Sequence, residues 1–146
     1  MLTLKDIRKI IDILNEDTFV YDWKEFLRTI NSGKRDFVMN KYRFVHKDDI
    51  DNVVIESYLG DEYVLGSFYP SFISEASDLS EELVQAIQDA GRNELIGQHL
   101  IDNGYAEDMI IGASAQDGYG AMLDSYDGNT NERLVDLLGY YFWRNE

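Results

Sequence analysis

At 146 residues the chain has the length of one ordinary domain, and its hydrophobic content of 45% is typical of a folded globule rather than a disordered acidic tail. It has no cysteine, which excludes disulfides, thiol nucleophiles and cysteine-bound zinc. Its net charge is -15, and a surface of that sign repels nucleic acids and anionic membranes. We therefore expect a single domain over residues 1–146 that binds neither of them directly.

The apolar segments of the chain are short. None approaches the roughly 20 residues that a membrane-spanning helix needs. The N-terminal stretch carries charges throughout, unlike the uninterrupted apolar region of a signal peptide. The sequence therefore predicts a cytoplasmic protein.

The first 35 residues favour two helices. Thr3 is placed to cap a first helix, in which Leu4, Ile7, Ile11 and Leu14 recur at helical spacing. Residues 22–30 fit a second, shorter helix, with Asn31-Ser32-Gly33 as its end. We expect this N-terminal helical segment, residues 1–35, to pack on the rest of the domain.

Two segments far apart in the sequence favour strands. Residues 37–45 include an alternation of Tyr42 and Phe44 with Lys41 and Arg43, and residues 139–144 are aromatic. We expect the two segments to pair as a small antiparallel sheet that brings the two ends of the domain together.

The remaining segments favour helices. Acidic residues suit the start of a helix that runs from Ile50 to about Leu59. Residues 63–77 are apolar almost all round, which predicts a buried central helix or helix-turn. Asp78 and Glu81 have the spacing of a capping box and would begin the next helix. The predicted fold class is α+β, mostly α-helical, with the small antiparallel sheet described above.

The motifs that usually carry chemistry are weak. Neither His46 nor His99 has a second histidine at helical spacing. Residues 124–132 resemble a calcium loop, but with Gly128 as its sixth residue the first and twelfth positions are Leu123 and Leu134, which offer no oxygen ligand. Gly118 and Gly120 are a fragment of a phosphate-binding pattern beside acidic side chains. We therefore predict no enzyme, catalytic residue, metal or cofactor, and expect these glycines to be structural.

The strongest functional signal is the distribution of charge. No lysine or arginine occurs between Asp48 and Gly91, where eleven carboxylates are mixed with tyrosines and aliphatic residues. Arginine binds carboxylate and phosphate in the same bidentate geometry and stacks on aromatic rings, so such a surface can occupy a basic nucleic-acid groove. The alternative is that the acidity serves solubility alone. The predicted partner-binding residues are Asp48, Asp49, Asp51, Glu56, Asp61, Glu62, Glu107, Asp108, Asp124 and Asp127.

A sequence motif between residues 115 and 129 resembles a group of other proteins. Ala115-Gln116-Asp117-Gly118-Tyr119-Gly120, followed by Ser125-Tyr126-Asp127-Gly128-Asn129, resembles small uncharacterised acidic proteins of bacteriophages and prophages over roughly residues 40–146. The chain departs from them at Ala121-Met122, where histidines are expected. The resemblance implies an inhibitor of bacterial defence, either anti-restriction or anti-CRISPR, that acts in the host cytoplasm on a nucleic-acid-binding protein such as a Cas effector. The alternative is a non-catalytic structural or protein–protein interaction module of the phage.

Overall fold

The computed structural model describes residues 2–145, and the chain divides into two compact units. Unit 1 comprises residues 1–51 and 118–146, and unit 2 comprises residues 52–117. Both units are helical and unit 1 adds a small antiparallel sheet, which confirms the α+β class. That the chain forms one domain stays a prediction, because two compact units can still unfold as one cooperative whole.

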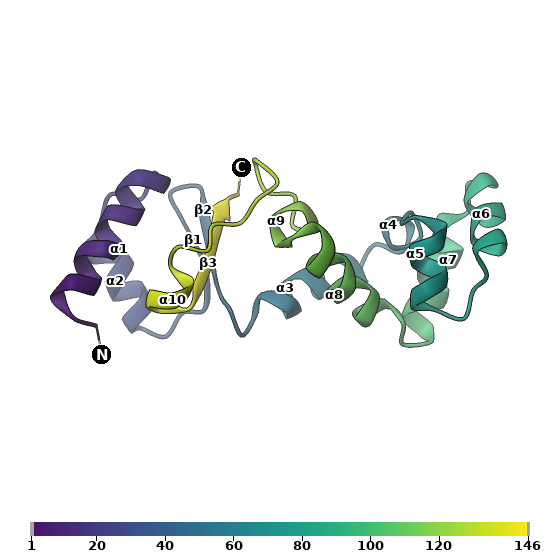
Figure 1. Ribbon diagram of the computed structural model, residues 1–146, viewed down its shortest axis with the longest axis horizontal. Coiled ribbons are helices and arrows are strands. Elements are labelled where there is room, and N and C mark those ends of the chain that lie inside the picture. The colour runs from purple at the N-terminus through teal and green to yellow at the C-terminus, as the bar shows by residue number, and fades with distance from the viewer. Residues whose placement is uncertain (1, 146) are drawn as a thin grey trace. The chain divides into compact units, whose positions relative to one another are not determined.

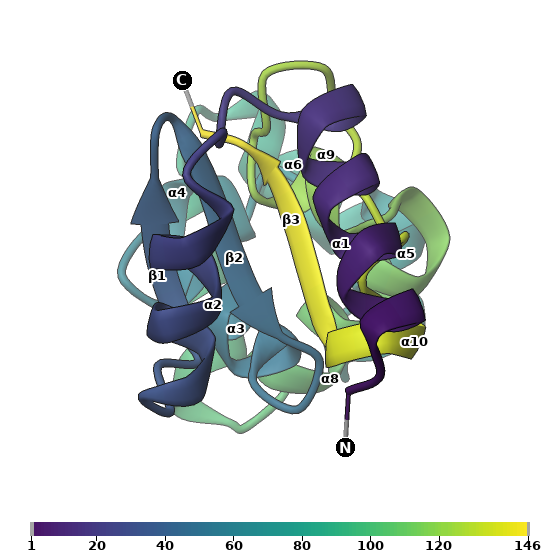
Figure 2. The same cartoon turned by 90° about the vertical axis from the view of Figure 1, so that its left-hand side faces the viewer.

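Unit 1 is built on a three-stranded antiparallel sheet of order β1-β2-β3. Its strands are β1 (Asp36–Met39), β2 (Tyr42–His46) and β3 (Tyr140–Arg144). Its helices are α1 (Leu4–Asp17), α2 (Trp23–Asn31) and the short α9 (Tyr119–Met122) and α10 (Val135–Leu138). The helices α1 and α2 lie over one face of the sheet (Figure 1 and Figure 2), and the sheet includes the predicted pairing of the C-terminal segment with residues 42–46.

A row of phenylalanines forms the core of unit 1. The strand register places Phe37 opposite Phe44 and Phe44 opposite Phe142, with ring centroids 5.1 and 5.3 Å apart. Phe26 of α2 packs on this row, 5.0 Å from the ring of Phe44. Side chains that alternate along a strand lie on the same face of the sheet, so this face is apolar and takes the two N-terminal helices.

The prediction of one strand over residues 37–45 is wrong, because a tight turn divides it into β1 and β2. Asn40 and Lys41 both have positive φ, 48° and 74°, as the two central residues of a type I′ hairpin turn do. Asparagine tolerates this conformation, and its side-chain amide donates a hydrogen bond to the carbonyl of Phe19. Tertiary contact therefore stabilises a turn that lacks the usual glycine.

The predicted starts of the N-terminal helices are confirmed. The Thr3 hydroxyl accepts a hydrogen bond from the backbone N–H of Asp6, and the Asp6 carboxylate accepts one from Thr3, which completes a capping box. These hydrogen bonds lower the pKa of Asp6. Asp22 caps α2 through the backbone N–H of Glu25. Local capping chemistry is therefore sufficient to place both helices.

In unit 2, all of whose residues the structure describes, the regular secondary structure is helical. Its helices are α4 (Glu62–Leu65), α5 (Pro70–Ala76), α6 (Glu81–Asp89), α7 (Asn93–Asp102) and α8 (Ala106–Asp117). It also contains α3 (Ile50–Leu59) from residue 52 onward. The helices α4 and α7 approach each other closely at Gly66 and Gly97. A Cβ at Gly97 would lie 1.9 Å from the carbonyl oxygen of Glu62, so only glycine permits this approach.

Two further expectations in unit 2 are wrong. Residues 63–77 do not form one buried central helix. They form the short helices α4 and α5 joined by a turn, in which Leu65 and Ile73 are buried but Tyr63 and Tyr69 are 55% and 82% exposed. Asp78 does not cap a helix, because Ser80 caps α6 and the Asp78 carboxylate instead lies 2.7 Å from Nε2 of His99. That hydrogen bond lowers the pKa of Asp78. In both cases a tertiary arrangement overrides a local pattern.

Candidate interaction surface

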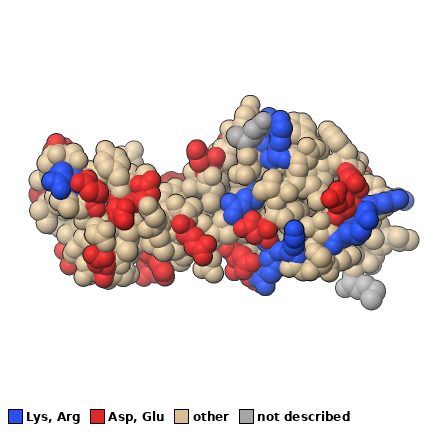
Figure 3. Space-filling view, turned by 180° about the vertical axis from the view of Figure 1, so that it is seen from behind, with Lys and Arg blue, Asp and Glu red and all other residues tan. Residues whose placement is uncertain are grey.

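The negative charge of the protein is concentrated in unit 2. Residues 52–117 hold thirteen carboxylates and one arginine, a net charge of -12, whereas unit 1 holds fifteen carboxylates and twelve lysines or arginines, a net charge of -3. On the face seen in Figure 3, nearly all of the lysine and arginine side chains lie over unit 1. The arginine of unit 2, Arg92, is itself paired with Glu94 at 2.6 Å. Unit 2 therefore presents a surface of one sign.

The structure assigns the ten predicted partner-binding residues equally to the two units. Unit 1 holds Asp48, Asp49, Asp51, Asp124 and Asp127, and unit 2 holds Glu56, Asp61, Glu62, Glu107 and Asp108. The predicted segment 48–62 thus belongs partly to one compact unit and partly to the other.

In unit 1 the predicted residues Asp48, Asp49 and Asp51 have partners within the chain. The guanidinium of Arg35 lies 2.9 Å from the carboxylate of Asp49 and 3.7 Å from that of Asp48. The Asp51 carboxylate accepts a hydrogen bond of 2.8 Å from the hydroxyl of Tyr119. Burial and this bond raise the pKa of Tyr119 well above its usual range. A partner would have to compete with these contacts.

The loop that carries the other two predicted residues of unit 1 is locally constrained. Asp124 has a φ of 54°, and the Asp127 carboxylate accepts a hydrogen bond from the backbone N–H of Asn129. Gly118 and Gly128, which flank this region, have φ values of 88° and 76°. These φ values lie in the left-handed region, which favours glycine, so Gly118 has the structural role that was predicted and Gly128 has the same kind of role.

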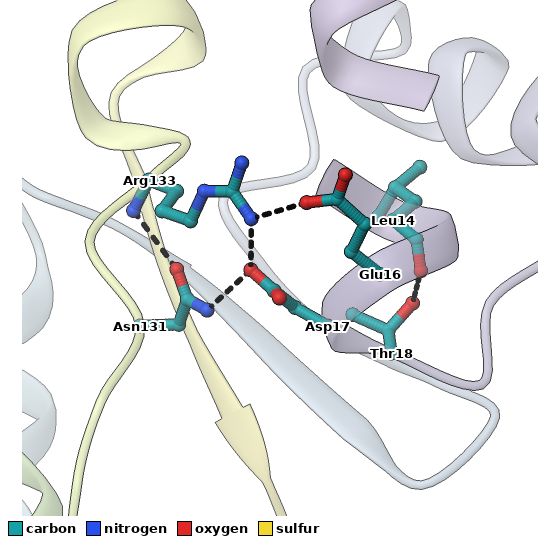
Figure 4. Close-up of polar contacts among 6 residues, drawn as sticks. All are labelled: Leu14, Glu16, Asp17, Thr18, Asn131 and Arg133. Carbon is teal, nitrogen blue, oxygen red and sulfur yellow. Dashed lines mark hydrogen bonds and ion pairs between the residues drawn. The ribbon is translucent and has the colours of Figure 1, made fainter. Parts of the chain in front are cut away.

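Arg35, Arg43 and Arg133 of unit 1 form ion pairs with its carboxylates. Figure 4 shows one of these contacts: Nη1 of Arg133 lies 2.8 Å from Glu16 and 2.9 Å from Asp17, and Asn131 also donates to Asp17. Glu16 and Asp17 are in the last turn of α1, where the helix dipole disfavours carboxylates. Arg133 therefore compensates an unfavourable helix end, and its pKa is raised by the two hydrogen bonds.

In unit 2 most of the predicted residues lie at helix N-termini. Asp61 caps α4 through the backbone N–H of Val64, Glu62 follows it, and Glu107 and Asp108 are in the first turn of α8. Carboxylates at these positions stabilise a helix through its dipole. Glu56, in α3, lies outside the first turn and is exposed.

Tyrosines were predicted between the carboxylates of the acidic surface, and two of them are exposed in unit 2, although the apolar segment 63–77 that contains them was also predicted to be buried. Tyr69 is 82% exposed and Tyr63 is 55% exposed, in a unit that carries almost no positive charge. The pairing of such rings with carboxylates is what arginine recognition uses. The single proline, Pro70, is the first residue of the short helix α5 and marks the break between α4 and α5.

The histidines lie in hydrogen bonds within the fold. Nδ1 of His46 accepts from the backbone N–H of Asp48, and His99 lies between Asp78 and Asn103. Among the described residues, no group of three or more histidine, aspartate or glutamate side chains is placed to hold a metal ion. No helix of the described part of the chain is long and apolar enough to cross a bilayer.

No family model matches the sequence, and neither the curated proteins nor the solved structures searched contain a match to it. The resemblance to phage and prophage proteins therefore stays a prediction.

Proposed function

We propose that the protein binds the basic, nucleic-acid-binding surface of another protein through unit 2 and competes there with nucleic acid. The observation that carries the proposal is the net charge of -12 on 66 residues whose single arginine is already paired with Glu94. Carboxylates meet arginine forks in the geometry that phosphates use, so this surface can replace a nucleic-acid backbone. Its field would also accelerate association with a positive cleft.

The resemblance to phage and prophage proteins favours a bacterial defence effector as the partner. A CRISPR effector holds its guide–target duplex in a positively charged channel, which an acidic protein could occupy. The protein would then be a phage-encoded anti-CRISPR or anti-restriction inhibitor that acts in the host cytoplasm without catalysing a reaction.

The second candidate is a phage structural or interaction module whose acidity has internal reasons. The observation in its favour is the placement of the unit 2 carboxylates. Seven of the thirteen cap a helix or lie in its first turn, where they stabilise the helix without any partner. These residues are Asp61, Glu62, Glu81, Glu82, Glu94, Glu107 and Asp108.

Inhibition assays with purified CRISPR effectors distinguish the two candidates. Each effector is loaded with guide RNA and supplied with target DNA, and cleavage is measured with increasing amounts of the protein at 50 and 200 mM NaCl. We expect one effector to be inhibited at the lower salt, with an affinity that falls at least about tenfold at the higher salt. Inhibition that does not respond to salt, or none across the panel and in matching restriction-enzyme assays, would favour the second candidate.

Two triple variants with the same change in net charge locate the interaction. Glu56→Gln, Glu107→Gln and Asp108→Asn neutralise exposed carboxylates of unit 2. The control neutralises exposed carboxylates of unit 1 through Asp12→Asn, Glu132→Gln and Asp136→Asn. We expect the first variant to weaken inhibition about tenfold and the control to weaken it much less, because contact charges matter more than net charge. Equal effects would show that unit 2 is not the binding surface.

A further inference from the structure

A cavity of about 490 Å³ lies in unit 2 beside the C-terminal end of α8, and its other wall is α5 with the residues before it. This volume is within the range of ligand pockets, about 300–1,000 Å³. Both helices are labelled in Figure 1. The aromatic, acidic and amide side chains that line the cavity are Phe68, Tyr69, Phe72, Glu75, Gln116 and Asp117.

One wall of the cavity is aromatic. The rings of Phe68 and Phe72 have centroids 5.8 Å apart and planes tilted by 49°, and Tyr69, next to them in sequence, is the most exposed aromatic residue of unit 2. The faces of such rings carry negative charge density and attract cations within about 6 Å. An aromatic wall open to solvent is therefore suited to a flat, weakly hydrated cation.

Two carboxylates, those of Glu75 and Asp117, give the cavity a negative charge that no basic side chain of its lining balances. Glu75 is in the last turn of α5 and Asp117 is the last residue of α8, so both carboxylates stand where the helix dipole is already negative. Within residues 2–145 neither carboxylate receives a hydrogen bond or ion pair, and no lysine or arginine lines the cavity. The comparable carboxylates of Asp89 and Asp102, at the ends of α6 and α7, each accept a hydrogen bond from a glutamine one turn earlier.

We infer that this cavity takes an arginine side chain of the protein partner. A guanidinium can stack on one of the two rings, Phe68 or Phe72, while it donates hydrogen bonds to a carboxylate of the cavity, Glu75 or Asp117, which a lysine ammonium cannot do as well. The inference rests on the proposed function, since it names the group through which a basic surface is recognised. It also accounts for two carboxylates that the helix dipole disfavours and no internal partner stabilises.

The test compares fluorescently labelled nona-arginine and nona-lysine peptides, with binding to the full chain measured by anisotropy at 50 mM NaCl. Both peptides carry nine positive charges, so charge alone gives them equal affinity. We expect nona-arginine to bind about tenfold more tightly, because a desolvated guanidinium–ring contact contributes that much. Phe72→Leu and Asp117→Asn should each reduce this preference to about twofold.

Asp102→Asn is the matched control, because it neutralises the last residue of α7 outside the cavity. It should leave the preference for arginine unchanged. Should Phe72→Leu fail to fold, Glu75→Gln and Asp117→Asn still test the inference, since neither alters apolar packing. Equal binding of the two peptides, or a preference that survives Glu75→Gln and Asp117→Asn, refutes the binding of arginine in the cavity and leaves the proposed function intact. If neither peptide binds, both the arginine site and the proposed function are refuted.

Discussion

Two glycines in neighbouring helices of unit 2 respond oppositely to the same substitution. Gly97 lies in α7 and Gly112 in α8, and alanine favours a helix over glycine by about 0.5–1 kcal/mol at either position. A Cβ at Gly112 would meet one side-chain atom, Cζ of Phe72, at 3.9 Å, an ordinary contact. We therefore expect Gly112→Ala to raise the free energy of unfolding by about 0.5–1 kcal/mol.

Gly97→Ala should instead destabilise the protein. Its Cβ would lie 1.9 Å from the carbonyl oxygen of Glu62, whereas close carbon–oxygen contacts are about 3.3 Å, so α4 or α7 must retreat by about 1.4 Å. Overpacking of this kind costs about 1–3 kcal/mol, and here the obstacle is backbone rather than a flexible side chain. Because a backbone obstacle places the cost near the upper end of this range, a net loss of about 1–2 kcal/mol is expected after the gain in helix propensity.

Urea denaturation measures both variants with two probes. Circular dichroism at 222 nm reports the helices of both units, while tryptophan fluorescence reports unit 1 alone, since Trp23 and Trp143 both belong to it. If the chain is one cooperative domain, Gly97→Ala shifts both midpoints together; a shift in circular dichroism alone would refute the single-domain prediction. A Gly97→Ala variant as stable as Gly112→Ala would refute the close approach of α4 to α7.

Three further predictions concern unit 1. Lys41→Gly should stabilise it by about 0.5–1 kcal/mol in urea denaturation, because Lys41 has a φ of 74°, and Lys41→Ala, which keeps a Cβ there, should not. Gly120→Ala should lower the melting temperature by several degrees, since its Cβ would lie 2.3 Å from the backbone of Asn129. The raised pKa of Tyr119 favours the neutral phenol, so its contribution to stability is complete below pH 10 and is lost as pH rises through the folded-state pKa. Tyr119→Phe should therefore leave unaltered the change in 295 nm absorbance that the folded protein shows between pH 9 and 11. In the urea-unfolded chain it should lower this change by about a tenth, because Tyr119 is one of ten tyrosines. An equal loss in the folded and unfolded states would contradict the raised pKa.

Local chemistry was sufficient to predict much of unit 1. Thr3 and Asp22 satisfy the first N–H groups of their helices with their own side chains, so the sequence alone indicates where α1 and α2 begin. The pairing of β2 with β3 follows from two aromatic segments that must bury the same kind of face. These features depend on residues within a few positions of one another or on strand alternation.

The errors occur where a distant residue decides the local structure. The turn at Asn40 and Lys41 has no glycine, and a carbonyl 21 residues away, that of Phe19, holds the asparagine in place. Asp78 has the spacing of a helix cap, yet His99, also 21 residues away, takes its carboxylate. No short-range pattern contains these contacts, so they could not be read from spacing.

The candidate interaction surface, too, could be predicted only in part from the sequence. The excess of carboxylates between residues 48 and 91 was visible in the sequence, but its assignment to unit 2 depends on where the chain leaves one compact unit and returns to it. The cavity brings residues 67–75 together with residues 113–117, which are about forty positions apart. An apolar run such as 63–77 does not reveal which of its rings face solvent.

The position of a carboxylate along its helix distinguishes an internal role from a role in binding better than the number of carboxylates does. A carboxylate in the first turn stabilises its own helix, so residues such as Glu107 would be retained in a protein with no basic partner. One in the last turn is disfavoured by the helix dipole, and a cation beside it offsets this cost, as Arg133 does for Asp17. Glu75 and Asp117 have no such group within the described chain, and both face the same aromatic cavity. If a basic partner supplies it, these two residues should control the preference for arginine, whereas the first-turn carboxylates should control mainly the salt dependence of binding.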